Sequence, residues 1–213
     1  MAHVPHVVLQ GPWVAPVLAP DPATERHLRS VMRLPDGAEV SYTDGAGAVG
    51  SGRLSAEGIV RGDESRVAAP PRLVVAVAPL RAKDRMRFLV EKLTELAVNE
   101  IWWLSTRFGQ VPAPSDGRVG GWARSALEQS RGSWLPTFRH VSWAEVTGAD
   151  LPIHVCDPGG GDARIAVPGI VVIGPEGGLH PEEIPHEATL RGLGPTVLRT
   201  ETAAIAAASL ARL

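Results

Sequence analysis

The strongest chemical signal in the chain is a glycine-rich segment, Gly174–Gly178, with the sequence GPEGG. It follows an apolar run of strand length, residues 170–173, and precedes Pro181-Glu182-Glu183, a pattern typical of a helix start. Glycines at the carboxyl end of a strand let backbone amides approach a ligand closely. The segment lacks the glycine patterns of dinucleotide and phosphate loops. We therefore predict a binding turn for a ligand other than a nucleotide phosphate, with a purely structural turn as the alternative.

A second candidate segment, residues 193–204, lies close to the end of the sequence. Thr200 is predicted to cap a following helix, in which the small residues of Ala203–Leu210 suit close packing against another helix or subunit. Arg199 and Glu201 flank the cap. A guanidinium can stabilise an anion and a carboxylate can accept a proton, so the pair is a candidate for catalysis. A helix-end ion pair is the structural alternative.

Composition excludes several classes of protein. The 213 residues are 44% apolar and 21% charged, which is ordinary for a packed domain. The single cysteine, Cys156, excludes a disulfide framework and a Cys-rich zinc cluster. Net charge is −2, so any contact with nucleic acid must come from local basic clusters. The first twenty residues lack Lys and Arg, and no apolar run approaches the roughly 18 residues of a membrane span, so we expect a cytoplasmic protein.

The elements that position these segments fall into two predicted domains, residues 1–69 and 70–213. The first is rich in turns and reads as a small antiparallel sheet or barrel, with one helical stretch over Arg26–Leu34 that places Leu28, Val31 and Met32 on one face. Pro70-Pro71 is the predicted linker.

The second domain alternates apolar strands with helices. The apolar runs are 73–78, 100–104, 153–156 and 170–173, and a helix over 83–98 carries one apolar stripe. Continuous apolar strands separated by helices predict an α/β domain with a mostly parallel sheet covered on both faces. Gly159–Gly161 is predicted to be a surface loop.

Several segments, in order, resemble the RsmE family of small-subunit ribosomal RNA methyltransferases. They are EKLTELAV at 91–98, EQS at 128–130, IGPEGG at 173–178, LGP at 193–195 and LRTETA at 198–203, and the stretch 26–34 with Asp44-Gly45 resembles the family's amino-terminal domain. The chain departs from the family at Ala97, where glycine is usual, and at His180, where Ser or Thr is usual.

The resemblance implies a SPOUT-class methyltransferase that uses S-adenosyl-L-methionine to methylate N3 of one uridine in 16S ribosomal RNA. It implies a carboxy-terminal α/β domain with a trefoil knot, an RNA-binding PUA-like barrel in residues 1–69, and a homodimer that acts on the RNA or on the 30S subunit. By resemblance, the two loops form the cofactor pocket. The predicted cofactor-binding residues are Ile173, Gly174, Glu176, Gly177, Gly178, Leu193, Gly194, Val197, Leu198 and Thr202.

Methylation at N3 raises a proton problem, because neutral uridine has no free lone pair there. Its N3 proton has a pKa roughly two units above neutral, so deprotonation costs about 3 kcal/mol at pH 7. A base, or a guanidinium that stabilises the resulting anion, can offset this cost. Arg199 and Glu201 are the predicted catalytic residues.

RNA contact is predicted at two basic clusters, and metal chemistry is not expected. The clusters are Arg26, Arg29 and Arg33 in the first domain, and Arg81, Arg85 and Lys92 on the face of the 83–98 helix that also carries Phe88. His154 and Cys156 are interpreted as core residues rather than metal ligands. Two alternatives stay open: a non-catalytic RNA- or ribosome-binding module on the same fold, and a SPOUT methyltransferase acting on another RNA.

Overall fold

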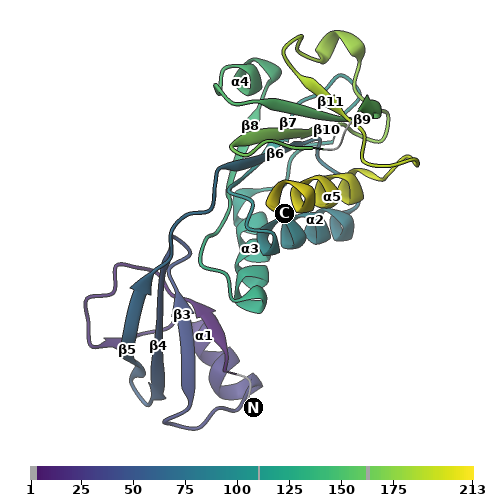
Figure 1. Ribbon diagram of the computed structural model, residues 1–213. Coiled ribbons are helices and arrows are strands. Elements are labelled where there is room, and N and C mark those ends of the chain that lie inside the picture. The colour runs from purple at the N-terminus through teal and green to yellow at the C-terminus, as the bar shows by residue number, and fades with distance from the viewer. Residues whose placement is uncertain (1–3, 110, 162–163) are drawn as a thin grey trace. The chain divides into compact units, whose positions relative to one another are not determined.

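The computed structural model describes residues 4–109, 111–161 and 164–213. Contacts divide the chain into two compact units, each with its own sheet (Figure 1). The first runs to Ala69 and also takes in Arg124–Leu135, and the second consists of Pro70–Ala123 and Pro136–Leu213. The first unit therefore includes a short stretch of chain from beyond residue 69.

The first unit is built on a five-stranded sheet with the order β1-β3-β4-β5-β2. Its neighbouring strands are antiparallel, except that β1 and β3 are parallel. The core beneath it includes Val40, Tyr42 and Ile59, all fully buried. The predicted small antiparallel sheet is present, and its closure into a barrel stays a prediction. The strands are β1 (His6–Val8), β2 (Val17–Leu18), β3 (Glu39–Thr43), β4 (Ala48–Ser55) and β5 (Gly58–Arg66).

The helical stretch of this unit begins earlier than predicted. Helix α1 (Pro22–Arg26) starts at the N-cap Asp21, whose side chain accepts two backbone N–H groups, with a proline at the first helical position. A π-helical turn, η1 (His27–Val31), follows and changes the angular spacing of the side chains. The prediction that Leu28, Val31 and Met32 share one face is therefore wrong for Val31, because 66% of it is exposed while the other two pack into the core.

The end of helix α3 (Asp116–Ser130) belongs to the first unit because it bonds to β1. Glu128 Oε1 accepts the Val8 N–H at 3.0 Å, and Arg124 Nη2 donates to the Val8 carbonyl at 2.7 Å. The same guanidinium nitrogen reaches Asp21 Oδ2 at 2.7 Å. The EQS segment noted in the sequence thus has a structural role in this unit, since Glu128 fixes the β1 backbone.

The second unit contains a six-stranded sheet with the order β11-β9-β10-β6-β7-β8, in which all neighbouring strands are parallel. Every residue of β6 and β10 is buried, as the continuous apolar runs predict. The strands are β6 (Leu73–Val77), β7 (Glu100–Leu104), β8 (Thr137–Val141), β9 (Ile153–Gly161), β10 (Gly169–Ile173) and β11 (Thr189–Arg191).

Both faces of this sheet are covered, which confirms the predicted α/β layering. Helices α2 (Lys83–Glu95) and α5 (Thr200–Arg212) lie side by side on one face, with α5 against β6 and β10 (Figure 1). On the other face, Val146 of α4 (Trp143–Thr147) joins the core. Leu179 and Ile184, on either side of the single turn η2 (Pro181–Glu183), pack against that same core.

The glycine run after Asp157 is part of a strand rather than a surface loop. Gly159–Gly161 extends β9, and Gly192 N–H donates to the Gly161 carbonyl at 3.0 Å. A Cβ at Gly160 would lie 2.5 Å from the backbone carbon of Arg191. Glycine is therefore needed here because the backbone of β11 comes too close for a side chain.

Helix α2 ends three residues before the predicted end, in a Schellman arrangement. Val98 N–H donates to the Leu93 carbonyl at 3.0 Å and Ala97 N–H to the Thr94 carbonyl at 2.9 Å. This geometry puts Ala97 in the left-handed region, with φ of 53°. Glycine is the residue that such a position favours, so the Cβ of Ala97 places strain on the helix end that glycine would not.

Replacing this alanine should stabilise the protein. Ala97→Gly removes the left-handed strain of a Cβ, and we expect the free energy of unfolding to rise by about 1 kcal/mol. Urea titration followed by circular dichroism measures the change. Ala144→Gly, at an exposed position inside α4, is the matched control and should lower stability instead. A loss of stability in both variants would contradict the strain assigned to Ala97.

Candidate functional site

A cavity of about 400 Å³ lies at the carboxyl end of β10 and beside residues 156–158 of β9. Cys156 of β9 pairs in register with Ile173 of β10, so the residues that follow these two positions lie next to each other. The remaining wall comes from residues 193–199 and the first turn of α5. The lining residues are Cys156, Asp157, Pro158, Ile173, Gly174, Pro175, Glu176, Gly178, Leu179, Leu193, Gly194, Thr196, Val197, Leu198, Arg199, Thr200 and Ala203.

The first wall is the predicted glycine turn after β10. Gly178 N–H donates to the Pro175 carbonyl at 2.8 Å, which closes the turn, and Gly178 has a φ of 77° that glycine tolerates without strain. A Cβ at Gly174 would lie 2.9 Å from Leu179 Cγ. Gly178 is thus favoured by the backbone conformation of the turn and Gly174 by its packing, and both leave the backbone open to the cavity.

The second wall is tied to the first by one hydrogen bond. Thr200 Oγ1 donates to the Gly174 carbonyl at 3.2 Å. The prediction that Thr200 caps the helix is wrong. Thr200 is the first residue of α5, and Arg199 is the N-cap, without a side-chain capping bond. The hydroxyl holds the two loops together, and Thr200 does not cap the helix because it already lies in its first turn.

An ion-pair cluster beside the cavity connects α2, α5 and the glycine turn. Glu201 is only 7% exposed, and both of its carboxylate oxygens accept from Arg85, at 2.8 Å from Nε and 2.6 Å from Nη2. Arg85 Nη1 also donates to Glu176 Oε1 at 2.6 Å. These hydrogen bonds lower the pKa of Glu201 below its ordinary value, against the opposing effect of burial. Glu201 is paired with Arg85 and not with its neighbour Arg199.

Eight of the ten predicted cofactor-binding residues line the cavity, and two do not. Gly177 is exposed beside Phe108, and Thr202 points to the surface of α5. Of the predicted catalytic pair, Arg199 lines the cavity and Glu201 does not. β9 also contributes to the lining, through Cys156, Asp157 and Pro158, which were not among the predicted site residues. The sequence signal for this contribution is the apolar run 153–156. In a parallel sheet, the residues that follow this run lie next to those that follow the neighbouring run 170–173.

The predicted basic cluster of the first unit does not form one helical face. Arg29 donates to Asp36 Oδ1 at 2.6 Å and to the Ser55 carbonyl. Arg33 lies beyond the helical turns, with a φ of 55°, and it and Arg26 are exposed. The three side chains thus have different surroundings, and among the described residues Arg29 alone of the three forms an ion pair with a carboxylate.

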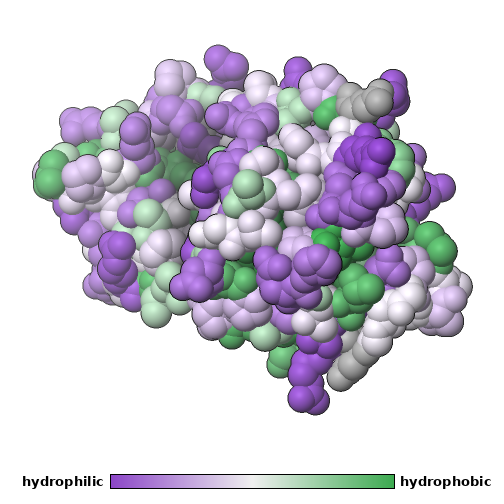
Figure 2. All heavy atoms as spheres, turned by 90° about the horizontal axis from the view of Figure 1, so that it is seen from above, coloured by the Kyte–Doolittle hydropathy of each residue, from purple (hydrophilic) through white to green (hydrophobic). Residues whose placement is uncertain are grey.

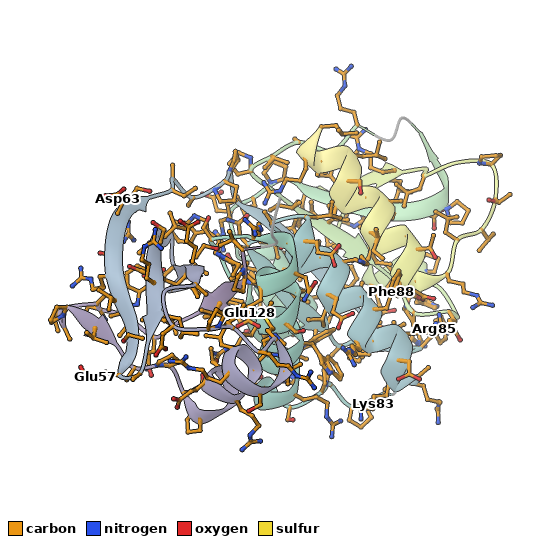
Figure 3. The ribbon with its side chains drawn as sticks, turned by 90° about the horizontal axis from the view of Figure 1, so that it is seen from below. Glu57, Asp63, Lys83, Arg85, Phe88 and Glu128 are labelled. Carbon is orange, nitrogen blue, oxygen red and sulfur yellow. The ribbon has the colours of Figure 1, made fainter. Side chains whose placement is uncertain are left out.

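The predicted basic cluster on α2 is also partly engaged. Figure 3 shows Lys83, Arg85 and Phe88 on this helix. Lys92 Nζ lies 2.8 Å from Glu95 Oε1 and 5.7 Å from the centre of the Phe88 ring, which is 47% exposed. Arg81 is exposed. Figure 2 shows the molecule from above, where hydrophilic residues alternate with smaller hydrophobic areas.

His154 has the surroundings of a core residue, whereas Cys156 is half-buried and lines the cavity. His154 is 3% exposed and its Nε2 accepts the Ala166 N–H at 3.0 Å. Burial, followed by the charge of Arg191, lowers the pKa of His154. Burial raises the pKa of the Cys156 thiol to about 12, so the sulfur is a thiol at neutral pH. In the part of the chain that the structure describes, no group of three His, Cys, Asp or Glu side chains is placed to hold a metal.

The ion pair of Glu201 predicts a pH-dependent contribution to stability. Because the folded-state pKa is lowered, the contribution is present above the unfolded value near 4.5 and is lost as pH falls through the folded value. Glu201→Gln should lower the free energy of unfolding at pH 7 by about 2 kcal/mol. Urea titrations at pH 7 and pH 3.5 should show the difference from the unmodified protein shrinking at the lower pH. The exposed Glu182→Gln is the control, and a gap that is equal at both pH values would argue against the ion pair.

Comparisons with known proteins agree with this architecture. Residues 68–212 match a family model described as RNA methyltransferase domain, and no curated protein matches. Three solved structures share the fold. A probable rRNA methyltransferase from Porphyromonas gingivalis is 24% identical, covers 97% of this chain and 96% of its own, and has a TM-score of 0.83. A putative methyltransferase from Legionella pneumophila, in complex with its cofactor SAM, is 23% identical over 99% and 97% of the two chains, with a TM-score of 0.84.

The third structure is ribosomal RNA small subunit methyltransferase E from Neisseria gonorrhoeae, bound to S-adenosyl methionine. It is 24% identical over 97% of this chain and 96% of its own, with a TM-score of 0.79. No helix among the described residues is long and apolar enough to cross a membrane. The family match covers well over half of the chain and confirms the resemblance seen in the sequence. The chain therefore belongs to the RNA methyltransferase domain family.

Proposed function

We propose that the protein is an S-adenosyl-L-methionine-dependent methyltransferase that methylates N3 of a specific uridine in 16S ribosomal RNA. The observation that carries the proposal is the cavity, because it joins both glycine-containing segments of the sequence at the carboxyl ends of parallel strands. The family match and the fold shared with two cofactor-bound methyltransferases support it.

The cavity fits this cofactor in size and chemistry. Its volume of about 400 Å³ falls within the range typical of small-molecule sites. Ile173, Leu179 and Leu198 offer apolar surface for an adenine ring, and the open backbone at Gly174 and Gly178 offers hydrogen bonds. When bound there, the cofactor supplies the methyl group. Gly177 and Thr202 stay in the proposed set as residues that flank the lining.

The finer features of the fold and assembly are proposed on the resemblance. We infer that residues 193–200 are part of a trefoil knot, supported by the bond that returns Thr200 to Gly174. We infer a PUA-like barrel for residues 1–69. A homodimer is supported by the small residues of α5 and by Val197, which is 81% exposed beside the cavity. An enzyme that modifies ribosomal RNA is expected in the cytoplasm.

We assign different roles to the two predicted catalytic residues. Arg199 is exposed and lines the cavity, so its guanidinium can stabilise the anion that forms when N3 loses its proton. Glu201 has both oxygens bonded to Arg85 and a lowered pKa, which makes it a poor proton acceptor. We propose that Glu201 acts as a positioning residue, because it fixes the first turn of α5, from which Arg199 projects.

RNA contact is proposed for the six predicted cations, with different demands on each. Arg26, Arg33 and Arg81 are exposed and can meet a phosphate directly. Arg29, Arg85 and Lys92 already bond to carboxylates of the protein, so a phosphate must compete with Asp36, Glu201 and Glu95. We therefore expect the first three to contribute most of the salt-dependent affinity.

Binding of the cofactor is the direct test of the pocket. Gly194 lines the cavity with a φ of 140°, so Gly194→Val adds a branched side chain where the ligand lies and where the backbone disfavours one. Calorimetric titration should show S-adenosyl-L-methionine binding to the unmodified protein and at least about a tenfold loss in the variant. Gly121→Val, in open space on α3, is the control.

Equal binding by Gly194→Val and the unmodified protein would remove residues 193–199 from the pocket. An unmodified protein that binds RNA and not the cofactor would favour the non-catalytic module instead. Methylation of 30S subunits and free 16S RNA in vitro, mapped by mass spectrometry, identifies the nucleotide. A methyl group on a different RNA would favour the third alternative.

Turnover tests the roles of Arg199 and Glu201. Arg199→Ala should lower the single-turnover rate by about 10², the effect of losing one electrostatic stabiliser of the transition state, while cofactor affinity changes little. Glu201→Gln should lower the rate by a similar factor at every pH between 6 and 9, because a positioning defect is not repaired by hydroxide. Recovery of the Glu201→Gln rate at high pH would instead identify Glu201 as the general base.

A further inference from the structure

Asp157 adds a carboxylate to the cavity from a strand that the sequence analysis did not connect with the site. It follows Cys156 in β9, next to the glycine turn that follows Ile173 in β10. The residue is half-buried and lines the cavity. Its Oδ1 accepts the Gly159 N–H at 2.7 Å, which fixes the side chain relative to the strand. The carboxylate is thus held in place by a neutral donor.

The other acidic groups at the site are compensated by a cation. Arg85 bonds to Glu176 at 2.6 Å and to both oxygens of Glu201. Among the residues that the structure describes, Asp157 has no ion-pair partner, and Arg199, which also lines the cavity, forms no salt bridge with it. The negative charge of Asp157 is therefore available to a ligand. A partly enclosed site strengthens its effect because little water is present to screen it.

We propose that Asp157 makes the pocket select the positively charged methyl donor over its neutral product, and this inference rests on the proposed function. S-adenosyl-L-methionine carries a sulfonium, an ammonium and a carboxylate, and so has a net charge of +1. When the methyl group moves to the nucleophile, the electron pair of the broken C–S bond stays on sulfur. S-adenosyl-L-homocysteine is therefore left with a neutral thioether and no net charge. A fixed carboxylate attracts the donor more strongly than the product.

This difference has a consequence for turnover. Donor and product have the same adenine, ribose and amino-acid groups, so the apolar walls and the backbone of the pocket bind both. Charge is the property that changes in the reaction, and of the charged groups in the lining the uncompensated carboxylate of Asp157 is the one that favours the cationic donor over the neutral product. Asp157 is thus a specificity-determining residue that favours release of the product and its replacement by a new donor molecule.

The experiment compares two ligands with one set of variants. Calorimetric titrations measure Kd for S-adenosyl-L-methionine and S-adenosyl-L-homocysteine in the unmodified protein, Asp157→Asn and Asp157→Glu. Asn keeps an oxygen that can accept the Gly159 N–H, so the fold of the strand end is retained while the charge is lost. Asp63→Asn makes the same charge change at an exposed site on β5 of the first unit and is the control (Figure 3).

We expect Asp157→Asn to weaken binding of the donor by about tenfold and binding of the product by less than about twofold. Asp157→Glu should keep most of the preference, and Asp63→Asn should change neither constant. Equal weakening of both ligands, or no change in either, would overturn the role of Asp157 and leave the proposed function intact. Failure of the unmodified protein to bind either ligand would overturn the proposed function itself, and the inference with it.

Discussion

A buried carboxylate that must be compensated is the constraint around which the site is organised. Removing Glu201 from water is unfavourable unless a cation and hydrogen bonds replace its solvation, and Arg85 supplies both through two nitrogens. The pair therefore fixes α2 and α5 relative to each other on one face of the sheet. Since the third arm of the same guanidinium holds Glu176, the glycine turn is tied to these helices as well. Arg199 and Thr200 then start α5 at the cavity, where the Thr200 hydroxyl reaches Gly174.

The parallel sheet explains why residues far apart in the sequence share this site. Each strand enters from the same edge, so Cys156 and Ile173 reach the opposite edge side by side, and the segments that follow them form neighbouring walls. Close packing of those segments demands glycine where a Cβ would collide, as at Gly174. The same residues that satisfy packing leave the backbone uncovered. Structural need and ligand access thus coincide in the turn, so its glycines serve the packing of the segment and at the same time leave room for a ligand.

The sequence predicts well the features that depend on local pattern. Continuous apolar runs identify β6 and β10, and the glycine segments identify most of the cavity lining. Asp21 and Pro22 are a local signal for the start of α1. The π turn that exposes Val31, in contrast, leaves no pattern in the spacing of the apolar residues. Two features required the fold. Asp157 joins the site only because β9 lies next to β10, and Arg85 meets Glu201 across 116 positions of sequence. No periodicity or motif encodes such pairings, because they depend on which elements become neighbours.

Two arginines near the cavity, Arg85 and Arg199, differ in whether a protein carboxylate already binds them. Arg85 is committed to two carboxylates, so transferring it to an RNA phosphate would leave Glu201 buried without a partner, at a cost greater than one exposed phosphate contact returns. Arg199 has no such commitment on its own side chain and faces the cavity. Two arginines close to the same pocket therefore have different surroundings although their residue type is the same. The one bound to protein carboxylates maintains the geometry, and the exposed one is the group that the proposed function places against the negatively charged reacting base.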